Sequence, residues 1–164
     1  MKQESPALAV GSVKKLAIEE AYEGITSNSG GPFGAVVVDI GGSEPIVVGS
    51  SHNMVLLNHD ATAHGEIQAI RVAGNNLNTH DLSNCVLFST AFPCPMCLSA
   101  IKWANIGKVY YGCTKEDTDA IGFRDDIFYN FVNLDKVDLD MEQICINECQ
   151  ELFRAYSNLN RERY

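Results

Sequence analysis

Residues 33–39 read FGAVVVD, a short apolar run that contains three consecutive β-branched valines. A run of this length and composition predicts a strand that is buried within a sheet. Gly41 and Gly42 follow it, and the chain then returns as IVVG over residues 46–49. Two such runs around a glycine turn predict a β-hairpin, which gives the sheet at least one antiparallel pair of strands.

Helices and strands are expected to alternate after this hairpin. Apolar residues at helical spacing also predict a first helix that begins near Ser12 and ends at Gly30 and Gly31. Later helices are expected over residues 63–73, 93–103 and 144–159, with helical pieces in 116–132. Later strands are expected over residues 85–89, 108–113 and 137–141. This alternation predicts a single α/β domain over residues 1–164, a three-layer α/β/α sandwich with a mixed sheet of about five strands.

Composition and charge limit the classes of function. The 164 residues are 46% apolar and 20% charged, which excludes a disordered chain, and the formal net charge is −9. Residues 116–151 hold eleven acids and two bases, so this segment alone sums to −9. That balance disfavours nucleic acid as a partner, because phosphate binding needs clustered lysine and arginine. Neither a membrane-spanning run nor a signal peptide is expected, so we expect no membrane partner and a cytoplasmic protein with reduced thiols.

Two short motifs contain residues that bind zinc. The first is His64-Gly65-Glu66, and the second runs from Pro93 to Cys97 as PCPMC; each stands at the start of an expected helix. Two cysteines three residues apart on a first helical turn project to one side, and the helix N-terminus favours their thiolate form. Two thiolates and one imidazole leave the fourth position of a tetrahedral zinc for water, which is the catalytic pattern. We therefore expect one Zn²⁺ per subunit, with His64, Cys94 and Cys97 as its ligands.

Glu66 lies two residues after His64 and is suited to be the general base that takes a proton from the zinc-bound water. The combination of His-x-Glu with Pro-Cys-x-x-Cys is the signature of zinc nucleobase deaminases. The four remaining cysteines are expected to pack in the core as small apolar side chains: Cys85, Cys113, Cys145 and Cys149.

The chain resembles the cytidine deaminase superfamily over roughly residues 18–164. Within that superfamily it is most similar to the bacterial and plant guanine and guanosine deaminases. The matching stretches are residues 30–36 (GGPFGAV), 52–53 (HN), 62–66 (TAHGE), 69–71 (AIR), 93–97 (PCPMC), 100–101 (AI), 103–104 (WA), 122–123 (GF) with Asp125, and 163–164 (RY). The resemblance implies a cytidine deaminase-like fold, a small-molecule nucleobase as substrate, and a homodimer.

The resemblance also implies contacts to the base itself. Asn53 would form a hydrogen bond with the edge of the base, and the backbone N–H of Gly65 would contact its ring. Phe33 and Trp103 would stack on the base or wall it. As alternatives, Phe33 fits a core position, Trp103 fits packing or a dimer interface, and Asn53 fits a turn.

The resemblance further implies two contacts from the C-terminal third of the chain. Asp125 would bind the exocyclic amine or shuttle a second proton, unless it belongs to the acidic surface. Residues 144–164 would form a helix and tail that close the active site, with Tyr164 folded over the pocket from its own chain or, in a swapped dimer, from the partner. Alternatively, Tyr164 belongs to a frayed end.

Three functions from different classes remain open. Hydrolytic deamination of guanine to xanthine and ammonia is favoured, while another base or nucleoside (cytosine, guanosine, ammeline) stays open because Gly65, Phe92 and Arg124 depart from the guanine deaminase pattern. A tRNA adenosine deaminase shares the zinc motifs but needs a basic surface that faces RNA. A zinc-stabilised binding domain without turnover would leave Glu66 without a purpose.

Overall fold

A five-stranded mixed sheet forms the centre of the molecule, in the order β2-β1-β3-β4-β5. The computed structural model describes residues 7–164. The N-terminal segment, in which no signal peptide is expected, therefore lies partly outside the described residues. β1 pairs antiparallel with β2 and β3, whereas the pairs β3–β4 and β4–β5 are parallel. The strands are β1 (Gly34–Asp39), β2 (Ile46–His52), β3 (Cys85–Ala91), β4 (Lys108–Cys113) and β5 (Asp140–Gln143).

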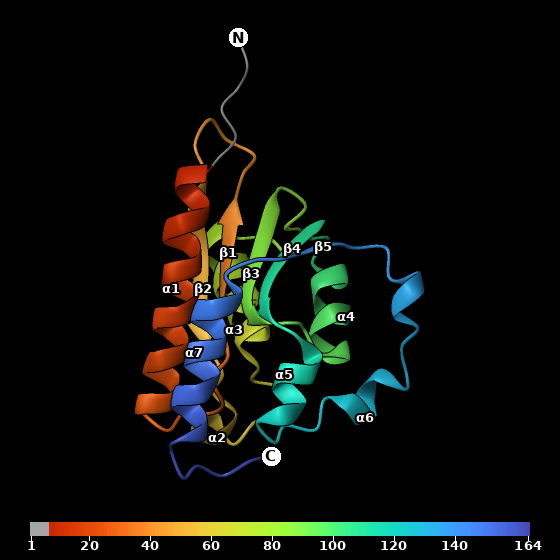
Figure 1. Cartoon of the computed structure of the whole chain (residues 1–164). Coiled ribbons are helices and arrows are strands. Elements are labelled where there is room, and N and C mark those ends of the chain that lie inside the picture. Colours follow the sequence, from red (N-terminus) through yellow and green to blue (C-terminus); the bar gives the residue numbers. More distant parts are fainter. Residues whose placement is uncertain (1–6) are drawn as a thin grey trace.

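Helices cover both faces of this sheet (Figure 1). On one face lie α1 (Ala7–Thr26) and α7 (Ile146–Ser157), and on the other lie α3 (Gly65–Leu77) and α4 (Pro95–Trp103). Alternation along β1 explains the two cores: Val36 and Val38 pack with α1, while Ala35 and Val37 pack with α3 and α4. The predicted three-layer α/β/α sandwich is thereby confirmed. The shorter elements are α2 (Val55–Asn58), α5 (Lys115–Ala120), α6 (Asp126–Tyr129) and the 3₁₀ helix η1 (Leu134–Lys136).

The observed boundaries differ from the expected ones in a few places. The first helix begins at Ala7 rather than near Ser12, and the segment between the second strand and the next expected helix contains the short α2. The last strand occupies Asp140–Gln143 instead of residues 137–141. The reason is local: the Asn133 side chain accepts a hydrogen bond from the Asp135 N–H and starts η1, so pairing with β4 begins only at Asp140.

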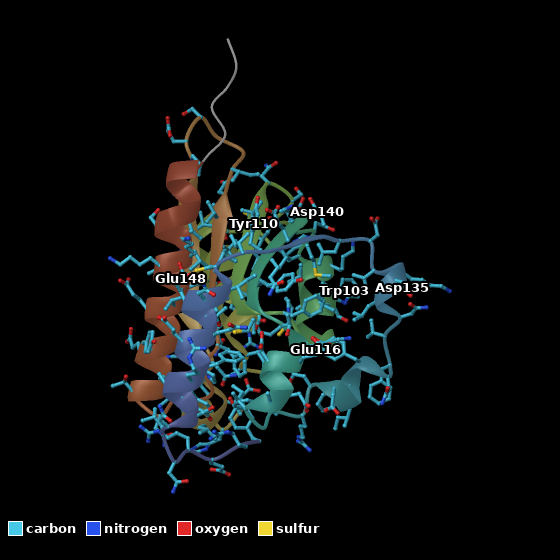
Figure 2. The ribbon with its side chains drawn as sticks, viewed as in Figure 1. Trp103, Tyr110, Glu116, Asp135, Asp140 and Glu148 are labelled. Atoms are coloured by element: carbon cyan, nitrogen blue, oxygen red, sulfur yellow. The ribbon has the colours of Figure 1, made fainter. Side chains whose placement is uncertain are left out.

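The acidic segment 116–151 is distributed over several elements and does not form one run on a single face. Figure 2 shows Glu116 on α5, Asp135 on η1, Asp140 on β5 and Glu148 on α7, and all four side chains are exposed. Across residues 7–164, none of the helices has the length and apolar character needed to cross a membrane.

The contact between α1 and β1 depends on a glycine. A Cβ built on Gly34 would collide with the carbonyl oxygen of Ala17 in α1. The absence of a side chain at this position therefore lets the helix backbone lie directly against the strand.

Substitution Gly34→Ala should lower the free energy of unfolding by about 1–3 kcal/mol, because the helix must move away from the sheet to make room. Urea denaturation measures this loss. The matched control is Gly107→Ala, where an added Cβ meets nothing within 4 Å. Equal losses in the two variants would contradict the proposed close approach.

Candidate active site

The N-terminal ends of α3 and α4 bring the zinc motifs together. His64 is the N-cap residue of α3, and Cys94 is the N-cap residue of α4, whose first helical residue is Pro95. Proline suits this position because its ring pre-sets the helical φ and it lacks only an N–H that would have no partner within the helix. The cap residues and Cys97 in the first turn of α4 therefore face one another from two different helices.

The distances between the three ligand atoms fit a tetrahedral zinc ion. Nδ1 of His64 lies 3.5 Å from Sγ of Cys94 and 3.6 Å from Sγ of Cys97. The three atoms all lie within 4.8 Å of one another. Tetrahedral zinc, with usual bond lengths to sulfur and nitrogen, separates such ligands by roughly 3.5 Å. The residues present thus match zinc in both donor chemistry and spacing.

The protonation of the two thiols also suits metal binding. Hydrogen bonds with Cys97 and His64 lower the pKa of Cys94 to about 4, against the opposing effect of burial. Burial raises the pKa of Cys97, which has no exposed surface. One thiolate is therefore already favoured without metal, and a metal ion would displace the second proton.

Glu66 is held beside this centre in the first turn of α3. Its side chain is buried, Oε1 accepts a hydrogen bond from Ser89 Oγ at 3.2 Å, and Oε2 lies 3.5 Å from Cys97 Sγ. Burial, followed by the charge of Cys94, raises the pKa of the Glu66 carboxyl. A carboxyl group with a raised pKa can accept a proton and return it near neutral pH, as a general base requires.

A cavity of about 620 Å³ opens above these residues. Its lining includes His64, Glu66 and Cys94, together with the aromatic side chains of Phe33 and Phe123. The rings of Phe33 and Phe123 pack edge to face with centroids 4.9 Å apart. The cavity therefore combines an apolar wall with a small number of convergent polar groups, which is the character of a small-molecule site.

Asn53 and Tyr164 meet at one side of this cavity, although they are far apart in the sequence. The Tyr164 hydroxyl donates a hydrogen bond to Oδ1 of Asn53 at 2.6 Å and accepts one from the Gly31 N–H at 2.9 Å. Oδ1 of Asn53 also accepts a hydrogen bond from the Val55 N–H at 3.1 Å. Tyr164 is therefore fixed in the wall of the cavity and is not frayed.

Asp125 lines the same cavity, on the turn that follows Gly122 and Phe123. Burial and the charge of Cys94 raise the pKa of its carboxyl to about 7. A second carboxyl group whose pKa is raised by burial thus faces the cavity, in addition to Glu66.

Two predicted contacts to the base are not found at the cavity. Trp103 is the last residue of α4, does not line the cavity and is 84% exposed (Figure 2). A helix of this length carries it roughly 13 Å from the end at which Cys94 lies, so the structure does not bring Trp103 to the cavity of its own chain, and its contact with a base stays a prediction. Gly65 does not line the cavity either; a Cβ there would lie 2.9 Å from the Phe33 carbonyl oxygen, so Gly65 packs against the segment that enters β1.

Sequence reasoning missed two features of the site. Ser89 binds Glu66 but sits inside an apolar strand, and its spacing in the sequence gave no signal of this role. Phe92 lines the cavity and packs edge to face on Tyr111, with centroids 5.0 Å apart. Its position directly before Pro93 was the available signal. The four other cysteines are free thiols packed in the two cores, as expected.

The family model for the cytidine and deoxycytidylate deaminase zinc-binding region matches residues 11–113, and the chain belongs to this family. Among curated relatives, a guanine deaminase of Bacillus subtilis is 35% identical over 153 residues, which cover 92% of this chain and 96% of that protein. A tRNA-specific adenosine deaminase of Buchnera aphidicola is 34% identical over 143 residues, or 87% of this chain and 89% of that protein.

Solved structures agree with this assignment. The structure of a guanine deaminase from Nitrosomonas europaea has a TM-score of 0.76 at 26% identity and covers 96% of this chain and 87% of that one. The Bacillus subtilis guanine deaminase has a TM-score of 0.69 at 34% identity, with 94% and 98% coverage. Together with the site geometry, these findings make the chain a zinc-dependent aminohydrolase.

Substitution Cys94→Ala should reduce bound zinc from about one ion per chain to less than a tenth of that, because one of three protein ligands is lost. Elemental analysis of the purified, dialysed protein measures the metal content. The control is Cys85→Ala, which removes a buried thiol outside the His-Cys-Cys group. Full zinc content in the Cys94 variant would show that the ion binds elsewhere.

Proposed function

We propose that this enzyme hydrolyses guanine to xanthine and ammonia. The observation that carries the proposal is the 620 Å³ cavity whose lining brings Glu66, two of the zinc ligands and Asp125 to a common space walled by aromatic rings. Full-length similarity to guanine deaminases supports guanine over other bases. The reaction forms a C–O bond from water and breaks the C–N bond to the exocyclic amine, which leaves as ammonia.

Zinc, when bound by His64, Cys94 and Cys97, supplies a Lewis acid that makes water a better nucleophile at neutral pH. Glu66 would take one proton from the attacking water and pass it to the ring nitrogen, and would then carry a second proton from the hydroxyl formed at the attacked carbon to the departing amine. Its raised pKa suits both transfers, and the hydrogen bond from Ser89 holds its carboxyl in place. Asp125, which also lines the cavity, would accept a hydrogen bond from the exocyclic amine or pass on the second proton.

The remaining residues would orient the base. Oδ1 of Asn53 is already occupied by Tyr164 and Val55, so the amide NH₂ is the part of Asn53 that can donate to an acceptor on the purine edge. The ring of Phe33 offers an apolar face to the planar base, and Tyr164 closes the side of the pocket. Gly65, packed behind β1, would contribute only its backbone N–H.

Residues 144–164 would act as the closing segment of a single domain that spans residues 1–164. In support, Tyr164 reaches Asn53 of its own chain. We also propose a homodimer, supported by large apolar side chains that are exposed in the single chain, among them Trp103 at 84% and Phe131 at 82%. In a swapped dimer the same tail contacts would form between subunits. Light scattering should then give about twice the 17.9 kDa of one chain.

The cysteines support a reducing compartment, and we place the enzyme in the cytoplasm. All six are free thiols, and two of them must stay reduced to bind zinc.

A substrate panel tests the proposed function. Ammonia release is followed with guanine, guanosine, cytosine, adenine, ammeline and tRNA, and guanine should give the highest kcat/KM. A preference for tRNA would instead favour the adenosine deaminase alternative, against which the exposed acidic side chains on α5, η1, β5 and α7 argue. No turnover of any compound by the zinc-loaded protein would favour a binding domain.

Replacement of Glu66 by Gln should lower kcat by about 10³-fold or more while zinc remains bound, because the proton carrier is lost and the fold is kept. Steady-state ammonia release together with metal analysis measures both effects. The control Ser89→Ala removes the hydrogen bond to Glu66 and the one that Ser89 Oγ accepts from the Ala91 N–H, and should cost about tenfold or less. Unchanged turnover in the Glu66 variant would contradict the assigned role.

The pH profile tests Asp125. Its carboxyl is protonated below about pH 7 and ionised above it, so kcat/KM should rise as pH increases through about 7 if the ionised form accepts from the amine. Substitution Asp125→Asn should lower kcat/KM and remove this step, while Asp126→Asn, which changes an exposed neighbour, should keep it. A step that survives in the Asp125 variant belongs to another group.

A further inference from the structure

The side chain of Arg163 makes three contacts with other parts of the chain, although it does not line the cavity. Its Nε donates a hydrogen bond to the Ile121 carbonyl oxygen at 2.8 Å, and Nη1 donates one to the Arg161 carbonyl oxygen at 2.6 Å. The guanidinium group also lies over the ring of Tyr156, 4.3 Å from its centroid. A planar group that donates two hydrogen bonds and stacks on an aromatic face is something that lysine cannot reproduce.

These contacts tie the tail to two parts of the fold that border the site. Ile121 ends α5 and begins the turn that leads to Phe123 and Asp125. Tyr156 lies on α7 and is only 1% exposed, so it offers a fixed surface. Gly122, next to Ile121, has a φ of +95°, which a glycine adopts without strain, and it lies in ordinary contact distance of the arginine stem.

Residues 158–164 form no helix or strand, and their backbone N–H hydrogen bonds are at residues 158, 159 and 161. The last residues therefore depend on side-chain contacts for their order, among them the hydrogen bond from the Tyr156 hydroxyl to the Glu162 carbonyl oxygen. Tyr164, the next residue after Arg163, reaches the Gly31 N–H and Oδ1 of Asn53. The contacts of the Arg163 side chain are therefore made at the position immediately before this tyrosine, whose ring lies in the cavity wall.

We propose that Arg163 is a positioning residue that holds Tyr164 against Asn53 and so organises the pocket for the base. The inference rests on the proposed function for its effect on substrate binding. Arg163 touches none of the groups expected at the reacting atoms, so its loss should affect KM more than kcat. The effect of losing Arg163 on KM should also depend on the Tyr164 hydroxyl.

A double-mutant cycle tests this coupling with guanine as substrate. Arg163→Ala and Tyr164→Phe should each raise KM by about tenfold and change kcat by less than about twofold. The double variant should resemble either single variant, because both changes break the same contact. Arg163→Lys should give an intermediate KM. The control Arg154→Ala removes an exposed arginine from the last turn of α7 and should leave KM unchanged.

Hydrogen exchange at the Gly31 amide gives a readout that does not depend on turnover. The amide donates to the Tyr164 hydroxyl, so Arg163→Ala should speed its exchange about as much as Tyr164→Phe does. If the wild-type enzyme fails to convert guanine, the proposed function fails while this measurement still tests Arg163. The inference is overturned if Gly31 exchange matches that of the Arg154 variant, or if the KM effects of the two substitutions multiply.

Discussion

The whole site depends on how the N-terminal ends of α3 and α4 meet. They place the imidazole of His64 and the thiols of Cys94 and Cys97 close enough together to bind one zinc ion. The separations of 3.5 Å and 3.6 Å between His64 Nδ1 and the two sulfur atoms leave little freedom in how the helices sit. The sheet provides that rigidity. α3 packs against β1, β2 and α4, and Ile101 of α4 belongs to the same apolar cluster as residues of α3 and of the sheet. Displacement of either helix would therefore alter the metal centre.

Burial then decides the chemistry of the carboxyl groups around that centre. Glu66 and Asp125 both face a cavity with apolar walls, and desolvation raises the pKa of each. A carboxyl group on the surface would stay ionised through the neutral range and would return a proton less readily. The fold thus supplies, within one pocket, ligands that hold a cation and acids that hold protons.

Local spacing in the sequence was enough to predict the metal ligands and the place of Glu66. Each motif lies at the start of one helix, so the relative positions of its residues depend only on the first turn of that helix. The layered fold followed from alternation, with Val36 and Val38 on one face of β1 and Ala35 and Val37 on the other. The direction of Trp103 could not be predicted in this way, since a helical residue near a motif can face the site or solvent.

Contacts between residues that are far apart in the sequence could not be predicted from local spacing either. The partnership of Ser89 with Glu66 requires knowledge of how β3 lies under α3. The contact of Tyr164 with Asn53 spans 111 positions and depends on α7 bringing the tail back to the far end of β2. The resemblance to known deaminases pointed to Tyr164, but only packing shows that Arg163 anchors it.

X-ray absorption at the zinc edge of the purified holoprotein tests the central claim most directly. The account predicts two sulfur ligands, one imidazole nitrogen and one light atom that exchanges with solvent, as befits a catalytic centre with an open position. Four sulfur ligands, or a fourth ligand from the protein that blocks that position, would contradict it.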